Sequence, residues 1–218
     1  MYYAIYTPSV ERAKAFYHAV FGWTFTSDNH IEGSSPAGGL GEGEPRIDLY
    51  LEVPDAAVAA AKARALGGTA TEPVRSKTGW STEIGDGHGG ALLLWQPADG
   101  YAEPDPKCAA GDLFYYVLMV ANDAAKQFHA DLLGLELTPG SHPGGSNIVN
   151  TRPIGGLFVH HAAPPDPNFQ VMDIDAALAK ITAAGGVAGE RQPNQSGWHA
   201  NCRDDQGVAF SIGSLRHD

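Results

Sequence analysis

The sequence predicts an α+β fold built from βαβββ modules, four in all. Three observations predict it. The chain repeats itself, each half changes from β-prone to helical periodicity in the same order, and glycine and proline separate the segments. Gly and Pro contribute 27 and 15 of the 218 residues, which indicates many turns between short elements.

The internal repeat is clearest around the first helix of each half. Residues 10–23 match residues 122–135 at an offset of 112, and Gly79-Trp80 matches Gly197-Trp198 at an offset of 118. One six-residue insertion between about 139 and 150 reconciles the two offsets. We therefore predict a tandem duplication, with one domain at 1–98 and a second at 112–215. Residues 99–111, rich in proline and glycine, form the linker.

The first module of each half reads as a strand, a helix and a second strand. Residues 2–7 and 113–120 are β-prone. The segment from 10 to 21 is helical because its apolar side chains fall on one face, and Gly22 and Gly134 follow as left-handed caps. Residues 23–27 and 135–138 are predicted to resume as strands. The apolar helical positions are Val10, Ala13, Phe16, Tyr17, Val20 and Phe21.

The second module begins with a strand at 46–53. A helix follows, with Asp55 or Asp173 as the N-cap that accepts backbone N–H bonds. Glycine pairs at 67–68 and 185–186 end this helix. Three further strands are predicted near 69–75, 79–85 and 90–96.

Composition excludes several classes of function. The chain has 14 Lys and Arg against 25 Asp and Glu, so its net charge of −11 opposes binding to nucleic acid or anionic membranes and attracts cations. No apolar run approaches the roughly 18 residues of a membrane span. No signal peptide is visible, so we expect a cytoplasmic protein.

The segment Phe16-Tyr17 to Phe21-Gly22-Trp23, the turn Asp86-Gly87-His88-Gly89 and the ending Leu93 to Pro97 resemble the vicinal oxygen chelate superfamily. That superfamily includes glyoxalases, bleomycin-resistance proteins and extradiol dioxygenases. The resemblance implies two glyoxalase-like domains whose mixed sheets are cupped and carry the helices on the outside. It also implies a metal held inside the cup in those members that catalyse metal chemistry.

The metal positions of the superfamily carry few ligands here. By the resemblance they fall on three pairs of residues: Tyr2 and Phe114, Asp48 and Asp166, and Leu93 and Ser211. A catalytic metal usually needs three protein ligands, so we predict no metal and no cofactor. An atypical ligand set involving Glu42, His160 or His161 stays open.

The same strands predict an aromatic pocket. Tyr2, Tyr50, Trp95 and Phe114 occupy positions that the superfamily turns toward its cup, with Asp48 and Asp166 as polar anchors. Trp80 and Trp198 either pack in the core or line the cleft, and His199 is either hydrogen-bonded and solvated or a catalytic base. The predicted ligand-binding residues are Tyr2, Asp48, Tyr50, Trp80, Trp95, Phe114, Asp166, Trp198 and His199.

Three functions follow, and the sequence leaves open whether the protein is an enzyme. We favour a metal-independent protein of the bleomycin-resistance type that binds a small hydrophobic or cationic molecule, as a monomer or homodimer. The alternative is a metal-dependent lyase or dioxygenase with an atypical ligand set. The second alternative is a non-catalytic scaffold that binds a partner through an exposed apolar patch.

Overall fold

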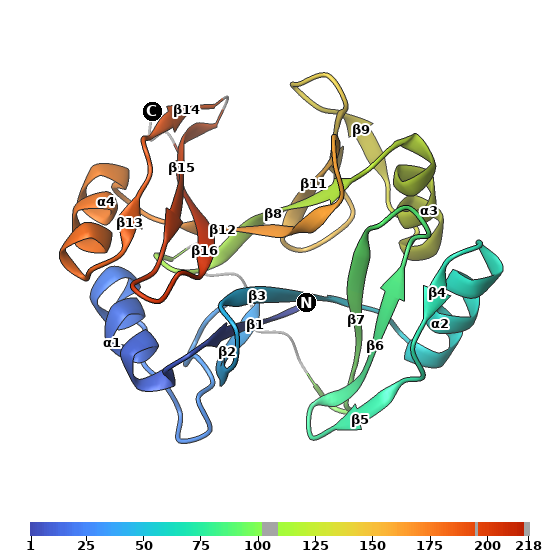
Figure 1. The fold of residues 1–218 in the computed structure, drawn as a ribbon, viewed down its shortest axis with the longest axis horizontal. Coiled ribbons are helices and arrows are strands. Elements are labelled where there is room, and N and C mark those ends of the chain that lie inside the picture. Colours follow the sequence, from blue (N-terminus) through green and yellow to red (C-terminus); the bar gives the residue numbers. More distant parts are fainter. Residues whose placement is uncertain (102–108, 195, 216–218) are drawn as a thin grey trace. The chain divides into compact units, whose positions relative to one another are not determined.

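The computed structural model describes residues 1–101, 109–194 and 196–215, and it confirms the predicted α+β fold (Figure 1). The described residues contain four α-helices and two mixed sheets. The elements of the first half are β1 (Tyr2–Thr7), α1 (Val10–Phe21), β2 (Ala37–Glu42), β3 (Arg46–Glu52), α2 (Ala56–Ala65), β4 (Thr69–Ala70), β5 (Val74–Ser76), β6 (Gly79–Gly85) and β7 (Ala91–Pro97).

The second half repeats this order with two additional strands before its second helix. Its elements are β8 (Leu113–Val120), α3 (Asp123–Leu133), β9 (Leu137–Pro139), β10 (Gly145–Ile148), β11 (Ile154–Val159), β12 (Ala163–Gln170), α4 (Ile174–Ala183), β13 (Val187–Ala188), β14 (Gln192–Pro193), β15 (Gly197–Arg203) and β16 (Ala209–Leu215).

Each sheet lies within one half of the sequence. The seven-stranded sheet has the order β2-β1-β3-β7-β6-β4, and β5 pairs with β6. The nine-stranded sheet has the order β13-β15-β16-β12-β8-β11-β10-β9, and β14 pairs with β15. Corresponding strands keep the same register: β3 runs parallel to β7 with Tyr50 opposite Leu93, and β12 runs parallel to β16 with Asn168 opposite Ser211.

The chain forms two compact units that do not follow the halves. Unit 1 comprises Met1–Tyr2, Leu49–Ala102 and Tyr115–Asp166, and unit 2 comprises Tyr3–Asp48, Glu103–Phe114 and Pro167–Asp218. Helices α2 and α3 contact each other in unit 1, and α1 and α4 contact each other in unit 2 (Figure 1). The domains 1–98 and 112–215 stay a prediction, and residues 102–108 of the predicted linker lie outside the described residues.

Helix α1 confirms the predicted face and cap. All six predicted apolar positions are buried, Ser9 caps the first turn, and Gly22 follows the helix at φ 77° in the left-handed region. The predicted strand at 23–27 is wrong. Trp23 is instead buried against Phe21, with ring centroids 4.9 Å apart, and Phe25 forms only an isolated bridge to Ile31.

The first strands show that the repeat contains a one-residue shift. The N-caps Ser9 and Asn122 are 113 positions apart, whereas the C-caps Gly22 and Gly134 are 112 apart, because α1 has 12 residues and α3 has 11. The fully buried Tyr3 therefore corresponds to Tyr116. Each ring lies where a Cβ on a glycine of the neighbouring strand, Gly38 or Gly155, would collide with it. Tyr2 thus corresponds to Tyr115, and its predicted equivalence to Phe114 is wrong.

The N-cap of α2 offers a direct test of a predicted element. The Asp55 carboxylate accepts hydrogen bonds from the N–H groups of Ala57 and Val58 at 2.8 and 2.9 Å. We expect Asp55→Ala to lower the free energy of unfolding by about 1 kcal/mol, measured by urea denaturation. Asp55→Asn should restore most of that stability, because asparagine is an equally good N-cap. Equal stability of the alanine variant and the wild type would contradict the capping role.

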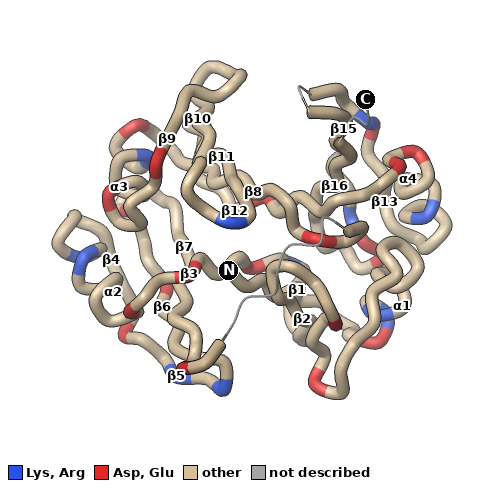
Figure 2. Tube along the Cα trace, turned by 180° about the vertical axis from the view of Figure 1, so that it is seen from behind, with Lys and Arg blue, Asp and Glu red and all other residues tan. Residues whose placement is uncertain are grey.

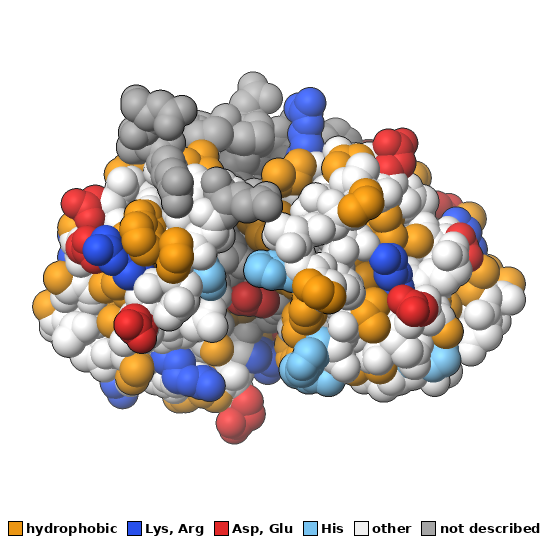
Figure 3. All heavy atoms as spheres, turned by 90° about the horizontal axis from the view of Figure 1, so that it is seen from above, with side chains coloured by type: hydrophobic (Ala, Val, Ile, Leu, Met, Phe, Trp, Pro, Cys, Tyr) orange, Lys and Arg blue, Asp and Glu red, His pale blue; other side chains and the backbone are white. Residues whose placement is uncertain are grey.

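Charged side chains are spread over the chain. Acidic and basic residues are scattered along the trace (Figure 2), and both signs are interspersed with apolar side chains on the face shown in Figure 3. The surface thus carries its acidic excess diffusely, as a solvated surface does. No helix among the described residues is long and apolar enough to cross a membrane.

Candidate functional site

The strands of each sheet have one face covered by helices and one helix-free face. In β3, Ile47, Leu49 and Leu51 are buried, while the alternating positions Asp48 and Tyr50 are half-exposed. The same alternation places Leu93 and Trp95 of β7 on the helix-free side, because Leu92 and Leu94 are buried on the other. We call the helix-free positions of β3, β6 and β7 the first face, and those of β12, β15 and β16 the second face.

The first face carries an aromatic cluster that the sequence predicted. In unit 1 the ring of Tyr2 lies 6.1 Å from that of Tyr50 and 6.0 Å from that of Trp95, measured between centroids. Tyr101 packs edge-on against Trp95 at 4.9 Å, and Trp95 is only 4% exposed. The structure therefore brings three of the predicted site residues together, and the indole of Trp95 is buried against Tyr101.

The second face has small and polar residues at the equivalent positions. Cross-strand pairing places His199 opposite Gly213 and Asn201 opposite Ser211, where the first half has Ser81 opposite Trp95 and Glu83 opposite Leu93. Asn168, opposite Ser211, replaces Tyr50. The Ser211 hydroxyl donates to the Asn201 side chain at 3.0 Å. The duplicated faces have therefore diverged, one aromatic and one polar.

Gly213 allows the ring of Phe114 to approach the backbone of β16 closely on the second face. A Cβ at this position would lie 2.7 Å from Cζ of Phe114, closer than real Cβ contacts. The Phe114 ring therefore packs against the backbone at Gly213, where the first face holds the indole of Trp95. Phe114 is half-exposed, so its ring remains an apolar surface beside polar neighbours.

The second face contains one buried polar atom with an unusual environment, Nδ1 of His199. This nitrogen is buried, yet no hydrogen-bond partner for it exists among the described residues. A buried polar atom without a partner costs about 1–3 kcal/mol, so such an atom in a native structure calls for an explanation. Sequence reasoning singled out His199, but it missed Asn168, Asn201 and Gly213 because their meaning depends on the strand register.

Other predicted site residues lie elsewhere. Trp80 directly precedes the first-face residue Ser81 in β6, and Trp198 directly precedes the second-face residue His199 in β15. Successive side chains of a strand point to opposite sides, so neither tryptophan lies on the first or the second face. Trp80 is 39% exposed, and the guanidinium of Arg191 lies 4.5 Å over the Trp198 ring. Neither tryptophan joins the face that holds the neighbouring candidates.

The two predicted aspartates differ in their surroundings. Both carboxylate oxygens of Asp48 accept hydrogen bonds from Nε of Arg46, at 3.1 and 3.2 Å. Arg46 also lies 3.9 Å over the Tyr6 ring, which fixes the guanidinium in place. Asp166 is half-exposed in β12, two positions before Asn168.

The residues present do not fit a catalytic metal. Within 1–101, 109–194 and 196–215, no three His, Cys, Asp or Glu side chains gather closely enough to hold an ion. Glu42 is exposed at the end of β2. His160 and His161 follow β11 as exposed residues whose Nδ1 atoms contact each other, with the His160 ring stacked on Phe158. This pair alone falls short of three protein ligands.

Comparison with known proteins agrees with this fold. The sequence profile of the Glyoxalase/Bleomycin resistance protein/Dioxygenase superfamily matches residues 1–212. Among curated proteins, none matches the chain significantly.

Solved structures share the fold at low sequence identity. The Mn(II)-bound glyoxalase from Novosphingobium aromaticivorans is similar with a TM-score of 0.69 and 14% identity, covering 99% of this chain and 81% of that one. The 2,3-dioxygenase LapB from Pseudomonas sp. KL28 has a TM-score of 0.65 and 14% identity, covering 99% and 91%. Homoprotocatechuate 2,3-dioxygenase from Brevibacterium fuscum, in complex with 3,4-dihydroxyphenylacetate, has a TM-score of 0.67 and 13% identity, covering 99% and 80%.

These likenesses establish the fold, and the sequence profile establishes the family. The chain belongs to the Glyoxalase/Bleomycin resistance protein/Dioxygenase superfamily.

Proposed function

We propose that this protein binds a small hydrophobic or cationic organic molecule on its second face, without a transition metal. The observation that carries the proposal is the buried Nδ1 of His199, which has no hydrogen-bond partner among the described residues. The first half has Ser81 at this position, so the unsatisfied atom is particular to the second face. A ligand that hydrogen-bonds to His199 would remove the cost of leaving it unsatisfied.

The chemistry of the second face favours this ligand class. Phe114 contributes an apolar ring packed at Gly213, and Asn168, Asn201 and Ser211 place amide and hydroxyl groups on the same face. An unprotonated imidazole nitrogen accepts a hydrogen bond from an ammonium or hydroxyl donor. The net charge of −11 attracts cations to the surface. In small-molecule sites, specifically placed polar groups such as these fix the orientation of the ligand.

A ligand screen with matched variants tests the proposal. Thermal-shift measurements with cationic and aromatic natural products identify a ligand, and calorimetry measures its affinity. We expect His199→Ser to weaken binding roughly tenfold, because it removes one hydrogen bond to a buried group. Ser81→His, the reciprocal exchange on the first face, should leave the affinity unchanged. The proposal fails if no compound in a broad panel shifts the melting temperature, or if His199→Ser binds as tightly as the wild type.

A second exchange tests whether the space at Gly213 matters. Gly213→Trp introduces the residue of the first face, and we expect it to abolish binding because the indole and Phe114 cannot share the space. Trp95→Gly on the first face is the matched control and should retain binding. Circular dichroism establishes that each variant folds. Undiminished binding by a folded Gly213→Trp variant would place the ligand elsewhere.

Similarity to the Mn(II)-bound glyoxalase and the dioxygenases favours a second candidate, a metal-dependent enzyme of this superfamily. Elemental analysis of protein purified without chelators, followed by lactoylglutathione and catechol-cleavage assays with added Mn, Fe, Ni or Zn, tests it. A stoichiometric metal with turnover would establish this candidate and overturn metal-independent binding.

A further inference from the structure

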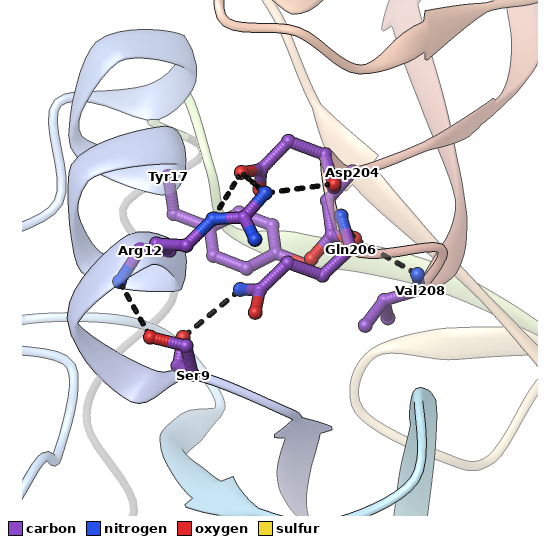
Figure 4. Close-up of polar contacts among 7 residues, drawn as sticks. Ser9, Arg12, Tyr17, Asp204, Gln206 and Val208 are labelled. Carbon is purple, nitrogen blue, oxygen red and sulfur yellow. Dashed lines mark hydrogen bonds and ion pairs between the residues drawn. The ribbon is translucent and has the colours of Figure 1, made fainter.

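Two buried polar pairs occupy equivalent places in the two units. In unit 1, Nε2 of His129 on α3 lies 3.3 Å from Oδ2 of Asp86 in the turn between β6 and β7, and the side chains are 2% and 0% exposed. In unit 2, the hydroxyl of Tyr17 on α1 donates to Oδ2 of the buried Asp204 at 3.2 Å (Figure 4). The helix residues are 112 positions apart and the aspartates 118, the two offsets of the internal repeat.

The two turns are constructed in the same way. Oδ1 of Asp86 accepts hydrogen bonds from the N–H groups of His88 and Gly90, at 2.7 and 2.9 Å. Oδ1 of Asp204 accepts from two N–H groups at equivalent places in its own turn, at 2.9 and 2.8 Å. In each unit, one carboxylate oxygen therefore holds the turn and the other faces the helix.

Aromatic packing beside each pair is also repeated. A Cβ on Gly68 would lie 2.7 Å from the ring of Phe128, and one on Gly186 would lie 2.8 Å from the ring of Phe16. Each phenylalanine directly precedes the polar helix residue, His129 or Tyr17. Helices α3 and α1 thus pack in the same way, and the two pairs differ mainly in the titratable group on the helix, His129 or Tyr17.

The two helix residues respond differently to pH. Burial raises the pKa of Tyr17 well above its usual value, and Asp204 raises it further, so this phenol stays neutral. Burial lowers the pKa of His129, and this effect outweighs the opposing attraction of Asp86. The His129 imidazole is therefore neutral in the folded protein near pH 7.

The surroundings of His129 give an independent reason why its imidazole ring resists protonation. Nδ1 of His129 is buried with no hydrogen-bond partner among the described residues. Nε2 lies 3.3 Å from Oδ2 of Asp86, so this nitrogen already has its neighbour in the neutral ring. A protonated ring would carry a second N–H with no acceptor, and a buried donor without an acceptor is destabilising.

Charged groups on the neighbouring elements are engaged elsewhere. His88, in the same turn as Asp86, lies with its Nδ1 3.5 Å from the side-chain nitrogen of Asn122 at the start of α3. Lys62 of α2 donates to the carbonyl of Leu132 at the other end of α3, at 3.1 Å. Lys126 of α3 donates to Ser146 of β10, and the strand β11, which also packs on α3, has no titratable side chain. Asp86 is the charged group that acts on His129 directly.

We infer that the contact between His129 and Asp86 is a pH-sensitive latch, which releases α3 from the 86–90 turn on mild acidification while Tyr17 and Asp204 hold the equivalent contact closed. The sign follows from linkage. The folded pKa of His129 lies below its unfolded value of about 6.5, so the stabilisation is present above about pH 6.5 and is lost as the pH falls toward the folded pKa. The loss is roughly tenfold in the folding equilibrium for each unit between the two pKa values.

Hydrogen exchange on the full chain tests the latch. We compare the protection of α3 and α1 amides at pH 7.5 and 5.5, corrected for intrinsic exchange, in the wild type, His129→Tyr and Tyr17→His. In the wild type, α3 should lose up to about tenfold protection, the most that one group with an unfolded pKa of about 6.5 can contribute down to pH 5.5, and α1 should lose far less. His129→Tyr should abolish the loss in α3, and Tyr17→His should transfer it to α1.

Two controls keep the test decisive. Burial raises the pKa of Asp204, so acid acts on that group in the opposite sense, and the difference between wild type and His129→Tyr cancels its contribution. His129→Gln, which cannot titrate, replaces His129→Tyr if the tyrosine does not fit. The inference is overturned if α3 and α1 lose protection equally, if either non-titrating variant keeps the acid response, or if the His129 ring titrates above pH 6.5 by NMR.

Discussion

Phe169→Ala should lower the free energy of unfolding by about 3–5 kcal/mol, the largest effect that we expect from a single substitution. The ring is fully buried in β12 and lies at the centre of an aromatic core in unit 2. Its neighbours are 5.4, 5.7, 5.6 and 6.3 Å away between ring centroids, and they are Tyr3, Phe21, Trp23 and Phe210. Truncation to alanine removes all four contacts and leaves a cavity that rigid rings cannot fill.

Urea denaturation followed by tryptophan fluorescence and circular dichroism measures this loss. Phe158→Ala in β11 is the control, because Phe158 is half-exposed and its removal leaves no comparable cavity. We expect the control to lose less than half as much stability. A Phe169→Ala variant as stable as Phe158→Ala would show that the aromatic core of unit 2 is not packed as described.

Asp204→Ala should have the second largest effect, a loss of about 3 kcal/mol in the free energy of unfolding. The carboxylate accepts hydrogen bonds from the N–H groups of Gln206 and Val208 and from the hydroxyl of Tyr17 (Figure 4). Alanine leaves these donors without their acceptor, and Asp204 and Tyr17 are both buried. Unsatisfied buried donors each cost about 1–3 kcal/mol.

Two substitutions separate the contributions at this turn. Tyr17→Phe removes only the hydroxyl and should cost about 1 kcal/mol. Asp205→Ala removes the ion pair with Arg12, at 2.7 Å, and should cost less than about 1 kcal/mol because the Arg12 side chain is 61% exposed. If Asp205→Ala proved as damaging as Asp204→Ala, the exposed ion pair and not the buried carboxylate would hold the turn.

Much of the fold could be predicted from local patterns. The six apolar positions of α1 are all buried as expected, and Asp55 and Asp173 both cap their helices. These features depend on neighbours three or four residues away, which a sequence displays directly. Strand β2 escaped prediction because Gly38 and Gly39 have low strand propensity. Their place in a strand depends on Tyr3, whose ring leaves no room for a side chain at Gly38.

The candidate site could be predicted only in part. Tyr2, Tyr50 and Trp95 were expected to converge, and the structure places the Tyr2 ring 6.1 Å from that of Tyr50 and 6.0 Å from that of Trp95. The distinction between the two faces was not visible, because it needs the register that sets His199 opposite Gly213. Successive residues of a strand point to opposite faces, so Trp80 and Trp198 lie on the other side of the strand from their neighbours Ser81 and His199.

The duplication and the family can be read from the chain alone, because they are recorded as repeated residues and periodic patterns. The contacts of Asp86 with His129 and of Asp204 with Tyr17, each joining different halves of the chain, are visible only in the folded molecule. Such pairings are set by burial and packing between segments far apart in sequence. No local pattern encodes them, and the difference between a histidine and a tyrosine acquires its meaning only beside a buried aspartate.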